Sequence, residues 1–245
     1  MRLTSQSRER SNAEPWPSLI WSLVVVFALA CSSEPLASGA DSGGSGSALP
    51  PGAAAASGAL PEGPGTYYLE TYPSGPYGTA VGSVLENYAF LGWRDPVASA
   101  YDPAKLETVR LSDFYDPDGR SGIKLLWINA SAVWCSVCKA EMRDIKQARV
   151  NATFSAKGVQ LIGTLFEDNE AGPARPSDLK LWGELPDHAI DFPLLLDPGF
   201  KLGAFFTSDA TPLNLLVDAS SMRVLDATMG YSPDYWQQVD RLLGN

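Results

Sequence analysis

Cys135 and Cys138, separated by two residues, are the side chains of this sequence best suited to chemistry. They follow the apolar run 123–128, which is typical of a buried strand, and precede a segment with helical spacing. At the start of a helix, unpaired N–H groups and the helix dipole lower a thiol pKa, so Cys135 is predicted to be the attacking thiolate. Cys138 begins an apolar stripe with Met142 and Ile145 and is predicted to face the core. One presented and one shielded sulfur suit disulfide exchange through a mixed disulfide.

Two other uses of the pair are weaker. A structural zinc site needs four ligands, and the pair supplies only three with His188, the single histidine, unless Cys31 also joins. No metal or other cofactor is therefore predicted. A purely structural disulfide across two residues would constrain the unfolded chain very little. His188 itself is predicted to be a solvated loop residue.

Alternating strand and helix patterns must position the pair. Extended segments are predicted at 88–92 and 109–111, and buried strands at 123–128 and 159–166. The other predicted elements are helices at 136–156 and 177–185 and strands at 192–196, 213–217 and 224–227. The helix at 136–156 has Met142, Ile145, Ala148 and Ala152 on its apolar stripe. A last helix is predicted to be capped by Ser232, with Pro233 in its first turn and Tyr235, Val239, Leu242 and Leu243 on one face. This order predicts an α/β fold with a mixed central sheet flanked by helices.

The first thirty residues have the pattern of an export signal. Arg2, Arg8 and Arg10 precede the apolar run Leu19–Ala30, whose 12 residues are too few to span a bilayer comfortably. Cys31 follows directly, where bacterial lipoproteins carry their lipidated cysteine. Ordinary cleavage after the small residues before Cys31 and an uncleaved anchor are the alternatives. All three place the rest of the chain outside the cytoplasm, in the cell envelope, and lipidation would tether it there, in the periplasm.

Composition separates a tether from a folded domain. Residues 31–66 are rich in Gly, Ala, Ser and Pro and cannot repay the entropy of ordering, so a flexible tether is predicted there. Aromatic and branched residues return in 67–245, the predicted folded domain. The net charge of −10 repels phosphate backbones, so nucleic acid is not an expected partner.

From about Val81 to Leu243 the sequence resembles the TlpA/ResA-like thiol-disulfide oxidoreductases, a redoxin branch of the thioredoxin superfamily. The resemblance lies in Val81–Ser83, Val109–Phe114, the strand leading into Trp134–Met142, Phe192–Asp197, Ala210–Pro212 with Leu215–Asp218, and Gly230–Tyr231. It implies a thioredoxin-like fold and a redox-active disulfide. It also implies that Pro212 is cis and faces the cysteines, and that Thr211 and Trp134 contact the bound partner. Partners would be protein thiols and disulfides, including apocytochromes, with a membrane protein as upstream electron donor.

Two departures from the family matter. Asn129 replaces the buried acid that thioredoxins carry six residues before the first cysteine, and an amide cannot accept a thiol proton. Glu141, three residues beyond Cys138, is the predicted replacement base, a position where related proteins also carry glutamate. A solvated glutamate that only favours the helix dipole is the alternative. The dipeptide Ser136-Val137 between the cysteines lacks the proline common in the family, so the reduction potential of the pair cannot be inferred from the family.

Two rival functions remain open. Peroxiredoxins share the fold but carry Thr three residues and Pro seven residues before the reactive cysteine, where this chain has Ala132 and Ile128. A copper-carrying or partner-binding module is the non-enzymatic alternative. Copper would favour His or Met beside the cysteines, and only His188 is offered.

Overall fold

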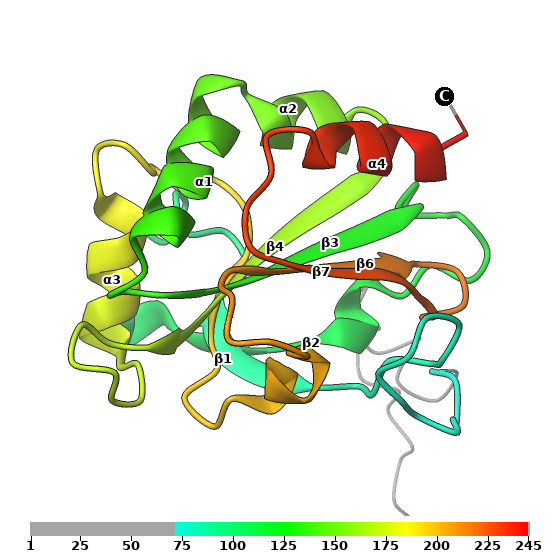
Figure 1. The fold of residues 1–245 in the computed structure, drawn as a ribbon, viewed down its shortest axis with the longest axis horizontal. Helices are drawn as coiled ribbons and strands as arrows, with labels where there is room; N and C mark the ends of the chain where they lie inside the picture. The colour runs from blue at the N-terminus through cyan, green and yellow to red at the C-terminus, as the bar shows by residue number, and fades with distance from the viewer. Residues whose placement is uncertain (1–71, 245) are drawn as a thin grey trace, which may run out of the picture. The chain divides into compact units, whose positions relative to one another are not determined.

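A seven-stranded mixed sheet forms the centre of residues 72–244, the part of the chain that this computed structural model describes (Figure 1). Residues 72–244 belong to one compact unit of the chain. The strands are β1 (Ala89–Trp93), β2 (Glu107–Arg110), β3 (Leu125–Ala132), β4 (Val159–Glu167), β5 (Leu194–Leu196), β6 (Leu213–Asp218) and β7 (Val224–Met229). Their order is β2-β1-β5-β4-β3-β6-β7. The predicted signal, Cys31 and the predicted tether lie outside the described residues.

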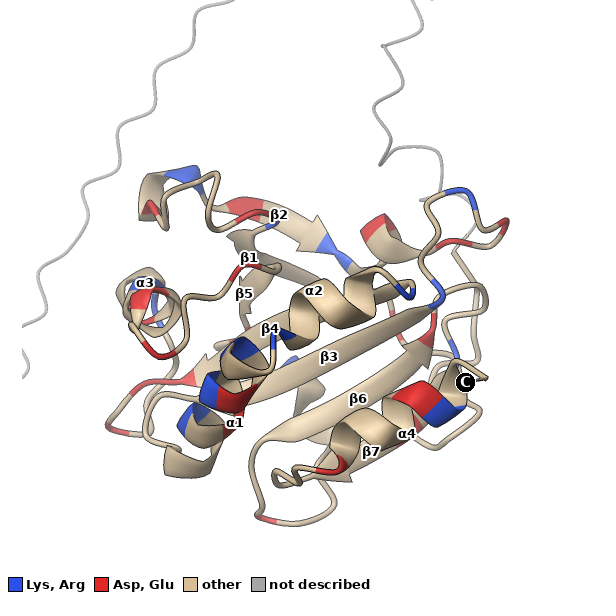
Figure 2. Cartoon of the chain, turned by 90° about the horizontal axis from the view of Figure 1, so that it is seen from above, with Lys and Arg blue, Asp and Glu red and all other residues tan. Residues whose placement is uncertain are grey.

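The centre of the sheet is parallel and its edges are antiparallel. β3 pairs with β4 and β4 with β5 in parallel, whereas β6 runs antiparallel beside β3. All eight residues of β3 are buried, as expected for a central strand covered on both faces. β3 also carries no charged side chain, which Figure 2 shows as an unbroken tan strand. The predicted mixed sheet is therefore confirmed.

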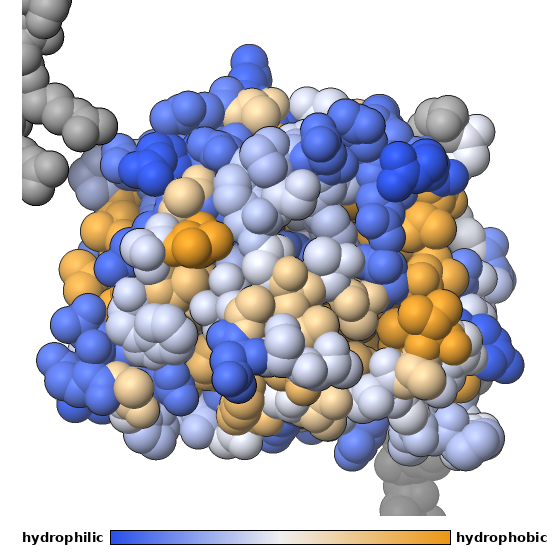
Figure 3. All heavy atoms as spheres, viewed as in Figure 1, coloured by the Kyte–Doolittle hydropathy of each residue, from blue (hydrophilic) through white to orange (hydrophobic). Residues whose placement is uncertain are grey.

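Helices cover the sheet and connect its parallel strands. They are α1 (Ser136–Gln147), α2 (Val150–Ser155), α3 (Pro176–Glu184) and α4 (Tyr235–Leu242), with 3-10 segments at Pro103–Lys105, Leu111–Phe114 and Lys201–Phe205. In Figure 1, α1, α2 and α4 lie above the sheet, and the segment that follows β5 lies below it. The outward side of the helices above the sheet is mostly hydrophilic, as the top of Figure 3 shows. No helix within residues 72–244 has the length and apolar character needed to cross a membrane.

The single helix predicted for 136–156 is wrong. The chain turns at Arg149, whose φ of 51° ends α1 and starts α2. The turn resets the helical phase, so Val150 and Phe154 are buried in place of the exposed Ala148 and Ala152. The ring of Phe154 packs edge-on against Trp127 of β3. Burying these larger side chains removes more apolar surface from water than burying two alanines would.

The last helix also differs from its prediction at both ends. The N-cap position of α4 is Asp234, whose side chain makes no capping hydrogen bond, and the helix begins at Tyr235, so Pro233 precedes it. Ser232 Oγ accepts the Asp234 N–H at 3.4 Å instead of capping the helix directly. Tyr235 and Val239 are buried as predicted, but Leu242 is 41% exposed. The helix is anchored by its N-terminal half, where Tyr235 packs against Trp127 with ring centroids 5.3 Å apart.

The pairing of β1 with β5 requires a glycine at position 92. A Cβ built on Gly92 would lie 2.4 Å from the carbonyl oxygen of Leu194 and 2.7 Å from the Cα of Leu195. We expect Gly92→Ala to lower the free energy of unfolding by about 1–3 kcal/mol or more, because backbone atoms cannot move aside cheaply. Gly199→Ala is the matched control: its Cβ would meet nothing within 4 Å, and a change within about 1 kcal/mol is expected. Urea unfolding measures both, and equal losses would contradict the prediction.

Candidate active site

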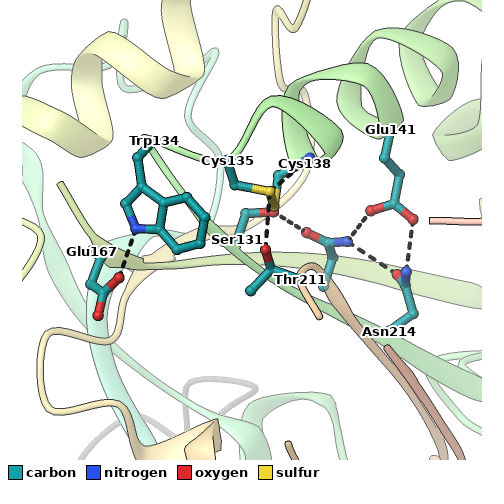
Figure 4. Close-up of a disulfide and its surroundings, with 9 residues drawn as sticks. Ser131, Trp134, Cys135, Cys138, Glu141, Glu167, Thr211 and Asn214 are labelled. Atoms are coloured by element: carbon teal, nitrogen blue, oxygen red, sulfur yellow. Dashed lines mark hydrogen bonds between the residues drawn. A yellow bond between two sulfur atoms is a disulfide. The ribbon is translucent and has the colours of Figure 1, made fainter. Parts of the chain in front are cut away.

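Cys135 and Cys138 are joined by a disulfide at the junction of β3 and α1 (Figure 4). Their Cα atoms lie 5.3 Å apart. Cys135 is the N-cap of α1, and its Sγ accepts the backbone N–H of Cys138 at 2.9 Å. The predicted placement of the pair at a helix start is therefore confirmed. The N–H group that points at Sγ would stabilise a thiolate there after reduction.

The predicted difference in exposure between the two sulfurs is not present in the disulfide form. Cys138 is fully buried, as predicted, but Cys135 is only 3% exposed. Part of its cover is Thr211, whose hydroxyl donates a hydrogen bond to Cys135 Sγ at 3.2 Å. The neighbouring Trp134 side chain remains 42% exposed. The two cysteines thus differ in their neighbours more than in their exposure.

The loop before β6 brings Thr211 and Pro212 to the disulfide. The Thr211–Pro212 peptide bond is cis, as predicted. Figure 4 shows Thr211 pointing toward the sulfur atoms from the side opposite α1. The resemblance implied a contact of Thr211 with the bound partner, and the contact of its hydroxyl with Cys135 is an addition to that expectation.

Glu141 is buried on the same helix as Cys138 and is fully excluded from solvent. Its two carboxylate oxygens accept hydrogen bonds from the amide nitrogens of Asn129 at 2.6 Å and Asn214 at 2.7 Å. Burial raises the pKa of Glu141 to about 7, and the two amides oppose that rise by stabilising the charged form. The alternative of a solvated first-turn glutamate is therefore wrong. A carboxyl group with this pKa exchanges protons readily near neutral pH.

The orientation of the two amides is fixed by the strands that carry them. Asn129 of β3 and Asn214 of β6 face each other in the antiparallel register. The Asn214 amide oxygen accepts hydrogen bonds from the Trp127 indole at 2.7 Å and from Asn129 at 3.1 Å, so its nitrogen is directed at Glu141. Ser131 donates to the Asn129 amide oxygen at 2.7 Å. Both amides consequently act as donors toward the carboxylate.

Asn214 was missed by the sequence analysis. A signal was present, because an amide between Leu213 and Leu215 interrupts an apolar strand and a buried amide needs partners. Glu167 at the end of β4 was also missed. Its carboxylate accepts the indole N–H of Trp134 at 2.7 Å and so holds the tryptophan beside the disulfide (Figure 4).

His188 is buried, and its prediction as a solvated loop residue is wrong. It is 4% exposed, its Nδ1 lies 3.1 Å from the carbonyl oxygen of Trp182, and its ring packs edge-on against that indole. Burial lowers the pKa of His188. Within residues 72–244 no group of three or more His, Cys, Asp or Glu side chains is placed to hold a metal ion.

Comparison with known proteins matches residues 98–222 to the AhpC/TSA family. The chain belongs to the AhpC/TSA family. Among solved structures, a protein from Chlorobium tepidum described as the thiol:disulfide interchange protein DsbE is 20% identical with a TM-score of 0.50, covering 68% of this chain and 100% of that one. An uncharacterized conserved protein from Geobacillus kaustophilus is 16% identical with a TM-score of 0.50, covering 68% and 84%. No curated protein sequence matches the chain.

The fold of this AhpC/TSA family member is thioredoxin-like, a mixed sheet flanked by helices, as the sequence predicted. The family and fold also support assignment of the chain as an oxidoreductase. The predicted site residues Trp134, Cys135, Cys138, Thr211 and Pro212 are brought together at one end of β3, with Glu141 further along α1.

Proposed function

We propose that the protein exchanges disulfides with protein substrates through Cys135 and Cys138. The observation that carries this proposal is the arrangement around one disulfide, with Cys135 capping α1 and contacting Thr211, and Cys138 fully buried behind it. An inert disulfide would not need a helix N-terminus, a hydroxyl donor and a buried carboxyl group beside it. Each of these groups instead matches a need of thiol chemistry.

The electrons exchanged come only from the two cysteines and the substrate disulfide. In the reduced protein the Cys135 thiolate attacks one substrate sulfur, the substrate S–S bond breaks and its other sulfur leaves as a thiolate. Cys138 then attacks Cys135 Sγ, which releases the second substrate sulfur and forms the Cys135–Cys138 bond. The substrate disulfide gains two electrons and the protein loses two. The same steps in reverse oxidise a dithiol substrate.

Glu141 would accept the proton that Cys138 must lose before this second attack. Cys138 is buried, and burial disfavours a thiolate. Glu141 lies three residues further along α1, so both side chains share one face of the helix. β3 carries no aspartate or glutamate near the pair, and we assign the role of base to Glu141.

The setting of the proposed reaction is the cell envelope. The predicted export signal and Cys31 support it, with lipid attachment at Cys31 as the favoured form of tethering. Proteins with exposed disulfides or dithiols are the proposed substrates, apocytochromes among them. A membrane protein would restore the redox state of the pair.

A single-turnover experiment tests the exchange. The reduced full chain is mixed with a peptide disulfide, quenched with an alkylating agent and mapped by peptide mass. We expect each turnover to reduce one peptide disulfide and to protect Cys135 and Cys138 together from alkylation. Full alkylation of both cysteines with the peptide still oxidised would refute the proposal.

Thiol peroxidase activity is the second candidate, since peroxiredoxins share the fold. Ala132 and Ile128 stand where peroxiredoxins carry Thr and Pro, and both are buried in β3. Neither side chain can donate a hydrogen bond to a peroxide. We therefore expect hydrogen peroxide to oxidise the reduced protein no faster than an ordinary low-pKa thiol. Stopped-flow measurement of peroxide consumption decides, and rapid turnover would favour the peroxidase.

A further inference from the structure

A groove with a volume of about 490 Å³ is lined by two neighbours of Cys135. Thr211, which contacts Cys135 Sγ, and Trp134, which precedes it in sequence, both line the groove. We call it the aromatic groove, because its other lining side chains include Phe166, Phe200 and Phe206. A polypeptide whose disulfide reaches Cys135 can therefore place its neighbouring residues in this groove.

Three phenylalanine rings form one side of the aromatic groove. Phe166 packs against Phe200 with centroids 4.5 Å apart and against Phe206 at 5.9 Å, and the last two rings lie 5.2 Å apart. Phe166 is buried, whereas Phe200 remains 41% exposed. The cluster thus presents an apolar surface that the fold itself does not cover.

Phe200 is held in place at a conformational cost. Its φ of 48° lies in the left-handed region, which is unfavourable for a bulky aromatic residue. The turn is fixed by Asp197, a buried residue whose carboxylate accepts the N–H groups of Lys201 and Leu202. The Phe200 ring packs directly over Gly203, because a Cβ at that position would lie only 2.5 Å from the ring. Although Phe200 packs on two other rings, 41% of it remains exposed beside the groove, where a substrate side chain could cover it.

The charged side chains that line the aromatic groove are both acidic. They are Glu167, which holds Trp134, and Asp209, which is exposed in the loop before Thr211. No lysine or arginine among residues 72–244 lines it. A cationic side chain would be attracted here and an anionic one repelled.

Resting on the proposed function, we propose that the aromatic groove selects extended substrate segments in which an aromatic or large aliphatic residue and a Lys or Arg flank the reacting cysteine. The apolar side chain packs on Phe200 and Phe206, and the cation lies near Asp209 and Glu167. Because consecutive residues of an extended chain rise about 3.3 Å, a residue one or two positions from the cysteine reaches the groove. Small acidic disulfides lack both features.

Blocked peptide disulfides without terminal charges test the selection. The reduced full chain is mixed with peptides whose cysteine is flanked by Phe and Lys, by Ala and Lys, or by Phe and Glu, and with neutral 2-hydroxyethyl disulfide as a reference. We expect the Phe–Lys peptide to react about tenfold faster than either of the other two peptides, since each loses one contribution to binding. The preference for Lys over Glu should weaken with added salt.

Phe200→Gly is the decisive variant, because glycine adopts the left-handed conformation readily and the fold keeps its turn. It should lose the advantage of Phe, so that the Phe–Lys and Ala–Lys peptides react at similar rates with this variant. Asp209→Asn should reduce the advantage of Lys. Val97→Ala, an exposed apolar residue that does not line the groove, is the control and should change nothing.

The outcomes separate the two proposals. Equal rates for all peptides, with 2-hydroxyethyl disulfide still reduced, overturn the groove selection and leave disulfide exchange in place. No reaction with any disulfide overturns both. If a second copy of the chain fills the groove instead, Phe200→Gly will shift the sedimentation of the protein toward monomer without changing peptide preference, which also overturns the selection.

Discussion

Cys138→Ser is expected to accumulate mixed disulfides between Cys135 and substrate proteins, whereas Cys135→Ser is expected to accumulate few or none. Cys138 is fully buried behind Cys135, and its N–H group is bonded to Cys135 Sγ. Cys135 contacts Thr211 at the end of the aromatic groove, where a partner can approach. Without Cys138 the second attack cannot occur, so the covalent complex persists.

The measurement is non-reducing electrophoresis after incubation of each reduced variant with a disulfide-containing protein, followed by mass mapping of the trapped band. We expect the trapped fraction in Cys138→Ser to exceed that in Cys135→Ser by at least about tenfold, because only one sulfur is placed for attack. The double variant gives the background. Equal trapping by both single variants would contradict the assignment of Cys135 as the attacking group.

The residues proposed to carry the chemistry could be predicted from the sequence because they lie close together along the chain. A cysteine pair between a buried strand and a helix fixes which cysteine caps the helix, and a three-residue step along one helix places Glu141 near Cys138. Pro212 required the family resemblance, since nothing local distinguishes a cis proline from an ordinary loop proline. The loop that carries Pro212 reaches the cysteines through a contact between Thr211 and Cys135, which lie 76 positions apart.

Features that depend on packing between distant segments could not be predicted from the sequence. The turn at Arg149 is stabilised by burial of Phe154 against Trp127, which no helical repeat reveals. His188 is buried because Trp182 covers it, and the cover of Cys135 comes from the loop before β6. The Asn129–Asn214 pair follows from the register of β3 with β6. Periodicity indicates which face of an element is apolar, but not which polar residues will meet across a sheet.

Glu141→Gln is expected to slow the release of substrate from the mixed disulfide on the order of 10²-fold at pH 7.5, the lower range for loss of a general base. The variant keeps the size of the side chain and removes its ability to accept the Cys138 proton. The measurement is the decay of a preformed mixed disulfide between Cys135 and a peptide. Glu170→Gln, which changes an exposed glutamate, is the matched control and should decay as the wild type does.

The pH profile separates a base from a structural role. Burial raises the pKa of Glu141 from 4.5 to about 7, so the carboxylate, the form that accepts a proton, is populated only as the pH rises through about 7. The decay rate of the wild type should rise through the same range. The rate of Glu141→Gln should rise only at higher pH, where the Cys138 thiol ionises without help.

The same raised pKa predicts a stability effect that does not depend on catalysis. A carboxyl group whose pKa is higher in the folded than in the unfolded protein contributes stability that is fully present below about pH 4.5 and is lost as the pH rises through about 7. The difference between 4.5 and 7 corresponds to about 3 kcal/mol. Urea unfolding of the oxidised proteins at pH 4 and pH 8.5 should therefore show the wild type losing more stability with rising pH than Glu141→Gln does. Identical pH dependence of stability would show that folding does not raise the pKa of Glu141, and an unchanged decay rate in the variant would remove it from the exchange reaction.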